Sequence, residues 1–215
     1  MTMILYGHPF SSYTWKAMIA FYEKEVDFDL RNVDPAFPEN VAHFAEIAPF
    51  GKFPILADGK HVIPESTIII EYLDHVVASP AMIPAEPDAA MEVRLLDRLF
   101  DNYVMNKMQA FAERAMGIAG EAQVARAKAT LDRSYAWLDA HMACREWAGG
   151  AAFTLADCAA APSLFYADWV HRIGDTLPHL QAYRQRLLAR PSVSRCVEGA
   201  RPYRHYFPLG APDRD

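Results

Sequence analysis

The sequence predicts an α/β N-terminal unit followed by an all-helical C-terminal unit. Over residues 3–77, short β-type apolar runs alternate with segments of helical periodicity. Beyond them only helical periodicities recur, and the intervening stretch 79–88 contains three prolines among small residues, which continue neither helix nor strand. We therefore expect one domain at 1–78 and a second at 89–215, joined by a linker at 79–88.

The N-terminal unit has the pattern of a sheet with flanking helices. The expected strands are 4–6, 28–31, 54–57 and 61–63, and the expected helices are 12–24 and 66–77. The pair Asp58-Gly59 separates the last two strands, and Asp-Gly between short apolar runs is a strong hairpin signal, so these two strands should be antiparallel. The Pro-punctuated stretch between residues 31 and 54 is expected to be irregular.

The C-terminal unit should be a set of helices. Their expected ranges are 89–116, 121–141, 155–171, 178–189 and 193–200. Thr154 and Asp157 have the spacing of an N-cap and its N3 partner, so a capping box should fix the start of a buried helix and give Asp157 a structural role. Residues 201–215 should form a tail on the surface. From the chain length, each half is expected to bury a core of its own.

Composition and charge exclude several classes of protein. The 215 residues are 52% hydrophobic, and no window approaches the roughly eighteen apolar residues of a membrane span. A net charge of -6 without clustered Lys and Arg argues against binding to nucleic acid. The three cysteines lack C-x-x-C spacing and the histidines lack ligand spacing, which argues against disulfides and metal. The N-terminus lacks the features of a secretory signal, so we expect a cytoplasmic location.

Three short segments place polar groups beside free backbone N–H groups. Ser11-Ser12 lies between the first strand and the first helix, where a helix N-terminus stabilises an anion, although such a serine alone is more often a cap. Glu65-Ser66 precedes the next helix and offers partners for both charges of an amino-acid end, or simply a cap. Phe53-Pro54 precedes a strand. A cis bond there would expose the Phe53 backbone to an extended peptide, whereas a trans proline at a strand edge is the ordinary alternative.

Together and in this order, these segments resemble the cytosolic glutathione transferase superfamily. The resemblance rests on Ser11-Ser12, Gly51-Lys52-Phe53-Pro54-Ile55-Leu56, Glu65-Ser66 with Ile69-Ile70-Glu71-Tyr72-Leu73, and Thr154-Leu155-Ala156-Asp157. It implies a thioredoxin-like N-terminal domain with a mixed four-stranded sheet, followed by an all-α domain. It also implies a detoxifying glutathione S-transferase, which activates the thiol of its co-substrate glutathione for attack on a hydrophobic electrophile and needs no metal.

The resemblance further implies a role for each site residue. Ser11 would donate a hydrogen bond to the glutathione sulfur, as in serine-type classes, with Ser12 either the second candidate or a helix cap. Phe53, before a cis Pro54, would pair with the cysteinyl backbone. The ends of glutathione would be held by Lys52 at the glycine carboxylate and by Glu65 and Ser66 at the γ-glutamyl group.

Tyr6 is the alternative donor to the sulfur, because tyrosine-type classes use a tyrosine near the end of the first strand. We prefer Ser11 because the helix dipole acts at its position, whereas a tyrosine in a buried strand is more often part of the core. The run 11–16 is also somewhat similar to the zeta-class motif, with Tyr13 in place of a cysteine and Lys16 in place of an arginine. A glutathione-dependent isomerase or lyase therefore remains open, as does a non-catalytic module that binds a protein partner.

The electrophile should bind between the two halves, near His8 and Phe10. Candidates for the facing wall are Met105, Met108, Phe111, Phe165, Tyr166 and Trp169, although such a stripe is as typical of core packing. Phe50 lies in the loop where the family often inserts an aromatic side chain into a second copy of the chain. We therefore expect a homodimer, the alternative being that Phe50 covers its own core.

Overall fold

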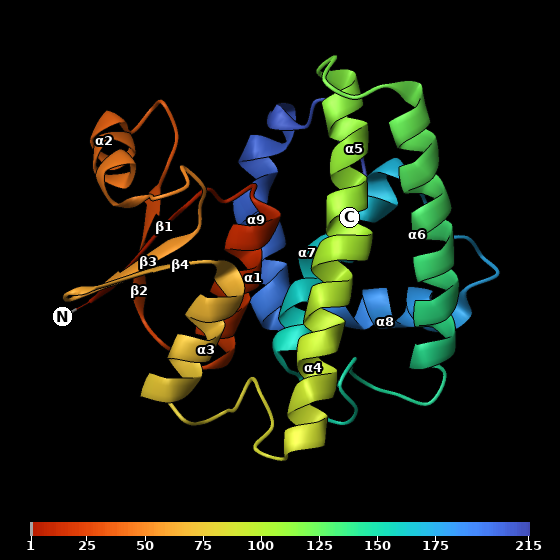
Figure 1. Cartoon of the computed structure of the whole chain (residues 1–215), viewed down its shortest axis with the longest axis horizontal. Coiled ribbons are helices and arrows are strands. Elements are labelled where there is room, and N and C mark those ends of the chain that lie inside the picture. The colour runs from red at the N-terminus through yellow and green to blue at the C-terminus, as the bar shows by residue number, and fades with distance from the viewer. Residues whose placement is uncertain (1) are drawn as a thin grey trace.

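The computed structural model describes residues 2–215 and begins with a mixed four-stranded sheet (Figure 1). The strands are β1 (Met3–Gly7), β2 (Phe28–Asn32), β3 (Ile55–Asp58) and β4 (His61–Pro64), in the order β2-β1-β3-β4. The helices of this unit are α1 (Ser12–Glu23), α2 (Pro38–Ile47) and α3 (Ser66–Val76). β1 runs parallel to β2 and antiparallel to β3, and β3 and β4 are antiparallel, as predicted.

Successive side chains of β1 and β3 point to opposite faces of the sheet, and both faces carry apolar residues. Leu5 pairs with Leu56, and both belong to the apolar cluster that includes α1 and α3. Their neighbours Tyr6 and Ile55 point to the opposite face and pack with Phe44 of α2. The sheet is therefore a middle layer between helices.

Two local predictions for this unit need correction. The stretch between residues 31 and 54 is not wholly irregular, because it contains α2, which begins at Pro38. Phe44 is the one residue of α2 that is buried, so the helix lacks the apolar stripe by which periodicity is recognised. The hairpin turn is Gly59-Lys60, one residue later than expected, because Asp58 still pairs with His61.

The C-terminal unit is helical throughout, so the predicted fold class is confirmed. Its elements are α4 (Pro87–Leu99), the π-helical segment η1 (Phe100–Met105), α5 (Asn106–Ala115), α6 (Glu121–Met142), α7 (Leu155–Val170), α8 (Pro178–Ala189), α9 (Pro191–Ala200) and the 3₁₀ helix η2 (Arg201–Tyr206). The single helix expected over 89–116 is thus three consecutive segments. Within residues 2–215, no helix has the length and apolarity needed to cross a membrane.

The two halves share one core, contrary to the expectation of separate ones. Trp15 of α1 packs on Phe165 of α7 with ring centroids 5.0 Å apart. Both rings belong to an apolar cluster that runs without interruption from Leu5 in the sheet to Phe207 near the C-terminus. Burial of this contact fixes α1, which carries part of the site, against the helical unit.

Asp157 organises the start of the central helix α7, as the capping box predicted. Its carboxylate is fully buried and accepts hydrogen bonds from the backbone N–H and the hydroxyl of Thr154. It also accepts from the Ala148 N–H at 2.8 Å and from the Tyr183 hydroxyl at 2.6 Å. One side chain therefore connects α7, α8 and the loop before α7.

We predict that Asp157→Ala lowers the free energy of unfolding by about 3–5 kcal/mol, because it strands several buried donors that each cost about 1–3 kcal/mol. Urea unfolding at a fixed protein concentration measures the loss. The exposed Asp27 provides the control, and Asp27→Ala should change stability by less than about 0.5 kcal/mol. A loss below about 1 kcal/mol for Asp157→Ala would contradict this role.

Candidate functional site

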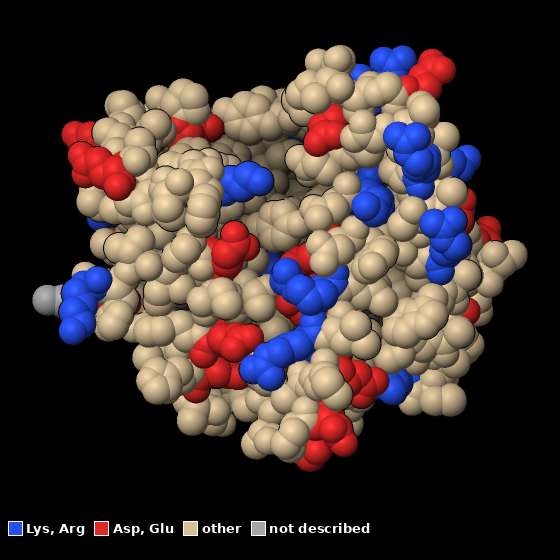
Figure 2. Space-filling model, in the orientation of Figure 1, with Lys and Arg blue, Asp and Glu red and all other residues tan. Residues whose placement is uncertain are grey.

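A cavity of about 730 Å³ lies between the N-terminal unit and α5, where the surface in Figure 2 is hollowed. Its N-terminal side is lined by Phe10, Ser11, Ser12, Tyr13, Gly51, Lys52 and Phe53. A second cavity of about 290 Å³ is also lined by Tyr13, Lys52 and Phe53, and adds Pro54, Glu65 and Ser66. The seven residues proposed from the sequence therefore lie around two cavities that share a wall.

Ser11 is the N-cap of α1, and its Oγ accepts a hydrogen bond from the Thr14 N–H at 3.3 Å. A hydroxyl that accepts one bond keeps its own proton for donation, so Ser11 can cap the helix and still donate into the cavity. Ser12 is the first helical residue, so the alternative in which Ser12 caps the helix is wrong. Its N–H is among those that a helix start leaves without an intrahelical partner.

The loop that carries Ser11 is held from two sides. A Cβ atom on Gly7 would lie 2.6 Å from Cγ2 of Thr14, so only glycine lets β1 end this close to α1. The Ser11 N–H donates to the His8 carbonyl at 2.9 Å. From the helical half, the Tyr166 hydroxyl of α7 donates to the Phe10 carbonyl at 2.8 Å. The position of Ser11 therefore depends on both halves of the chain.

Glu65 and Ser66 begin α3 at the edge of the second cavity. Glu65 has φ 72° and ψ 118°, a backbone conformation that side-chain-bearing residues rarely adopt. Ser66 is buried at the first helical position, where the backbone N–H groups of a helix start have no intrahelical partner and favour an anion. Across this cavity, the exposed Lys52 forms no ion pair with any residue in 2–215, and the Phe53-Pro54 bond is cis, as predicted.

Behind this edge lies an ion-pair network that the sequence analysis missed. The Lys16 ammonium group is almost fully buried and contacts Asp97 at 2.5 Å and Asp101 at 2.8 Å. It also donates to the Thr67 hydroxyl at 2.9 Å, and Arg98 contacts the same two carboxylates. Burial raises the pKa of Asp101 above its ordinary value, although Lys16 opposes this shift.

Tyr6 points away from both cavities. Its side chain packs with Phe44 and Ile55 on the α2 face of the sheet, and its ring lies 5.3 Å from that of His43. Burial also raises the pKa of its hydroxyl. Tyr6 lines neither cavity, so the geometry favours the serines over Tyr6 as partners of a ligand there.

Two family models match the chain. The glutathione S-transferase N-terminal domain matches residues 1–75, and the glutathione S-transferase C-terminal domain matches residues 121–186. The chain belongs to the cytosolic glutathione transferase superfamily. Both cavities thus lie in a protein of known family.

Relatives of this chain are named as three different kinds of protein. A stringent starvation protein A homolog from Coxiella burnetii is 30% identical over 83% of this chain and 77% of its own length. The glutathione S-transferase PARB from Nicotiana tabacum is 26% identical over 92% and 98%. A probable maleylacetoacetate isomerase from Vibrio cholerae is also 26% identical, over 94% and 98%.

Solved structures agree with the fold. A glutathione S-transferase from Methylobacillus flagellatus with glutathione bound has a TM-score of 0.79 and 26% identity, covering 91% of this chain and 98% of that one. Glutathione transferase F7 from Populus trichocarpa also has a TM-score of 0.79, at 20% identity, covering 92% and 99%. The second likeness supports the fold alone.

Only some of the residues expected to form the wall opposite the serines line the larger cavity. Met105, Met108 and Tyr166 line the larger cavity as expected, together with Phe10. Phe165, by contrast, is 2% exposed and packs on Trp15, because its position on α7 faces the core. Phe111 and Trp169 also pack against the core outside the cavity lining. His8 lines a neighbouring cavity of about 380 Å³ with Asp34 and Tyr206.

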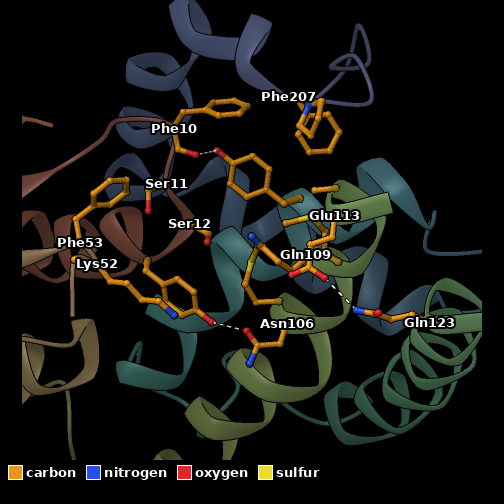
Figure 3. A pocket seen from close by; sticks show the side chains of 17 residues that line it. Phe10, Ser11, Ser12, Lys52, Phe53, Asn106, Gln109, Glu113, Gln123 and Phe207 are labelled. Atoms are coloured by element: carbon orange, nitrogen blue, oxygen red, sulfur yellow. Dashed lines mark hydrogen bonds between the residues drawn. The ribbon is translucent and has the colours of Figure 1, made fainter. Parts of the chain in front are cut away.

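The larger cavity also has a polar side, which was not predicted from the sequence. Its residues are Asn106, Gln109 and Glu113 of α5 and Gln123 of α6 (Figure 3). The first three recur at intervals of three and four beside the methionines, so helical spacing would have predicted a polar stripe next to the apolar one. The Tyr13 hydroxyl donates to Oδ1 of Asn106 at 3.0 Å and joins α1 to α5 at this point.

The C-terminal segment is part of the cavity, so the prediction of a tail that merely lies on the surface is wrong. Phe207 is 6% exposed and lines the cavity with Pro208. Just before it, the Tyr206 hydroxyl donates to Asp34 at 2.9 Å, and Asn32 donates to the Tyr203 hydroxyl at 3.1 Å. These contacts join two ends of the chain that no local pattern relates.

We predict that Glu65→Gly raises the free energy of unfolding by about 1 kcal/mol. Relief of a strained backbone is worth about 1–3 kcal/mol, and the greater freedom of glycine in the unfolded chain offsets up to about 1 kcal/mol of this. Chemical denaturation of the unliganded protein measures the change. Glu39→Gly, in the helix α2, should instead destabilise by about 0.5–1 kcal/mol, and equal losses for both variants would show that Glu65 is unstrained.

Proposed function

We propose that this chain is a glutathione transferase whose residues 1–78 bind glutathione and whose residues 89–215 complete the site for a hydrophobic electrophile. The observation that carries the proposal is the Ser11 hydroxyl, which lies at the start of α1 in a cavity that reaches the helical unit. The family and the glutathione-bound relative from Methylobacillus flagellatus support glutathione as the co-substrate.

In this proposal glutathione spans the two cavities. Its γ-glutamyl end lies at the start of α3, where Ser66 and the helix N–H groups receive the carboxylate and Glu65 receives the ammonium group. The cysteinyl backbone pairs with Phe53, and Lys52 binds the glycine carboxylate. This arrangement directs the sulfur toward Ser11, with Ser12 as its neighbour.

Ser11 and the dipole of α1 are sufficient to favour the thiolate. A thiol with an unperturbed pKa near 8.5 is ionised to only a few per cent at neutral pH, and a shift of about two units needs roughly 2.7 kcal/mol. One hydrogen bond to a charged group supplies about 1.5–3 kcal/mol and a helix N-terminus about 0.3–2 kcal/mol. The thiolate then attacks an electrophilic carbon held between Phe10 and the α5 wall.

A glutathione-dependent isomerase is the second candidate. It is favoured by the similarity to the probable maleylacetoacetate isomerase from Vibrio cholerae and by the zeta-like run Ser11-Ser12-Tyr13-Thr14-Trp15-Lys16. An isomerase regenerates glutathione, whereas a transferase consumes it. Measurement of thiol loss during turnover of maleylacetoacetate and of aryl halides, epoxides and enones therefore distinguishes the two.

We predict that Ser11→Ala raises the pKa of bound glutathione by about one to two units and slows turnover at neutral pH. The variant loses a donor that stabilises the thiolate, while the ends of glutathione keep their partners, so glutathione affinity should change little. Activity should recover as the pH rises through the new pKa, because the ionised fraction then increases. Titration of thiolate absorbance in the binary complex measures the shift.

Two variants control this experiment. Ser12→Ala lacks the neighbouring hydroxyl but keeps the cap of α1, and Tyr6→Phe alters a side chain outside both cavities. Both should leave the midpoint almost unchanged. A shift seen with Tyr6→Phe alone would refute the assignment of Ser11. Because Ser11 caps α1, Ser11→Ala should also cost about 0.5–2 kcal/mol of stability, which unfolding measures separately.

We also propose that the protein is a homodimer. Phe50 is 72% exposed, so the alternative in which it covers its own core is wrong. Further large apolar side chains are exposed on α3 and α4, at Ile68, Met91 and Leu95. Apolar side chains exposed on neighbouring elements are typical of a protein interface, and a symmetric dimer uses each of them twice.

Phe50→Ala should weaken this dimer at least about a hundredfold. Burial of one Phe contributes about 1.5–3 kcal/mol, and two-fold symmetry doubles the loss. Sedimentation over a range of concentrations measures the dissociation constant. Phe37→Ala, which removes another exposed ring of the N-terminal unit, is the matched control. A wild-type protein that sediments as a 24.2 kDa monomer at micromolar concentration would refute the dimer.

A further inference from the structure

The larger cavity contains one carboxylate that the proposed chemistry does not use. Of the 17 residues that line it, only Lys52 and Glu113 carry a charge. If glutathione binds as proposed above, its glycine carboxylate neutralises Lys52. Glu113 is then the charged side chain that faces the second substrate.

One oxygen of the Glu113 carboxylate accepts a hydrogen bond that fixes its position, and the other oxygen accepts none from the described residues. The side chain is half-buried near the C-terminal end of α5, and its Oε2 accepts a hydrogen bond from Nε2 of Gln123 at 3.0 Å. Gln123 comes from α6, so two helices fix this oxygen (Figure 3). The other oxygen, Oε1, accepts from no donor among residues 2–215, and Glu113 forms no ion pair there. It therefore has room for one more donor.

The surroundings of Glu113 divide the cavity into an apolar and a polar side. Along the helix, Met105, Met108 and Ala112 form an apolar stripe, and it faces the rings of Phe10, Tyr166 and Phe207. The parallel stripe of Asn106, Gln109 and Glu113 is polar. A substrate that fills this space must pack an apolar body and also replace the water around a carboxylate.

We propose that the second substrate is an electrophile with an apolar, ring-sized body and a protonated amine at the end remote from its reactive carbon. The amine donates to Oε1 of Glu113, the body packs between the methionines and Phe10, and the reactive carbon faces Ser11. This inference rests on the proposed transferase function and adds the charge of its substrate. Anionic electrophiles are disfavoured because the same carboxylate repels them.

Matched enones test the proposal. Phenyl vinyl ketone carrying a 4-dimethylaminomethyl group is protonated at pH 7, and its 4-isobutyl analogue has nearly the same shape without the charge. In each addition the glutathione sulfur bonds to the β-carbon, the alkene electron pair forms an enolate, and water protonates the α-carbon. Every kcat/KM is divided by the rate of the uncatalysed addition, which removes differences in intrinsic reactivity.

We expect the wild-type protein to prefer the cationic enone by about twofold to fivefold, which corresponds to the upper part of the range of about 0.2–1 kcal/mol for a partly exposed charge pair. Glu113→Gln keeps the shape of the side chain and can still accept from Gln123, so it should reduce the preference to about one, mainly by lowering kcat/KM for the cationic enone. Glu121→Gln, an exposed carboxylate nearby that does not line the cavity, should keep the preference. High salt should weaken it in the wild-type protein.

The outcomes separate this inference from the proposed function. Equal relative rates for both enones in the wild-type protein, or a preference that survives Glu113→Gln, would overturn the role of Glu113 and leave the transferase intact. Loss of the preference in Glu121→Gln as well would show that the overall field of the protein, and not Glu113, selects the cation. No catalysed addition to either enone, with no retention on immobilised glutathione, would instead contradict the transferase function itself.

Discussion

The buried ammonium group of Lys16 joins four elements around the site. Lys16 belongs to α1, which begins at Ser11, and it donates to Thr67 at the start of α3. Its carboxylate partners, Asp97 and Asp101, lie in α4 and in the segment η1 that leads into α5. Loss of Lys16 would leave Asp97 and Asp101 with Arg98 as the remaining cationic partner, and the loss of one member of a buried ion pair costs about 3–5 kcal/mol. The network therefore constrains the proposed glutathione side and the proposed substrate side to move as one body.

The π-helical segment explains how one long helical stretch serves two surfaces. A π-turn holds one residue more than an α-turn, so the side chains after it are rotated relative to those before it. Before η1, α4 exposes Met91 and Leu95 to solvent. At the junction of η1 and α5, Met105 and Asn106 line the cavity. An uninterrupted α-helix over 89–116, as the periodicity suggested, would not have changed its exposed face in this way.

Features that depend on a few consecutive residues could be predicted from the sequence, whereas contacts between distant segments could not. The positions of Ser11 and Ser66 follow from local signals, because strand ends and helix starts are visible in a few consecutive residues, whereas the cis Phe53-Pro54 bond was predicted only from the family resemblance. The helix α2 was missed because a helix with only Phe44 buried has little periodic signal. The contact of Tyr206 with Asp34 joins residues 172 positions apart and involves no motif, so it could not be predicted locally.

The two ends of the cavity also differ in the kind of residue that forms them. The end proposed to hold the thiol depends on backbone N–H groups and on short side chains at helix starts, whose positions are tied to the fold through Lys16 and Gly7. The substrate end consists of side chains on one face of α5 together with Phe207 from the C-terminal segment. Asn106 and Gln109 are exposed there, so their replacement costs little stability. The choice of electrophile can therefore change while the chemistry of the thiol stays the same, which accords with a superfamily whose named members include both transferases and isomerases.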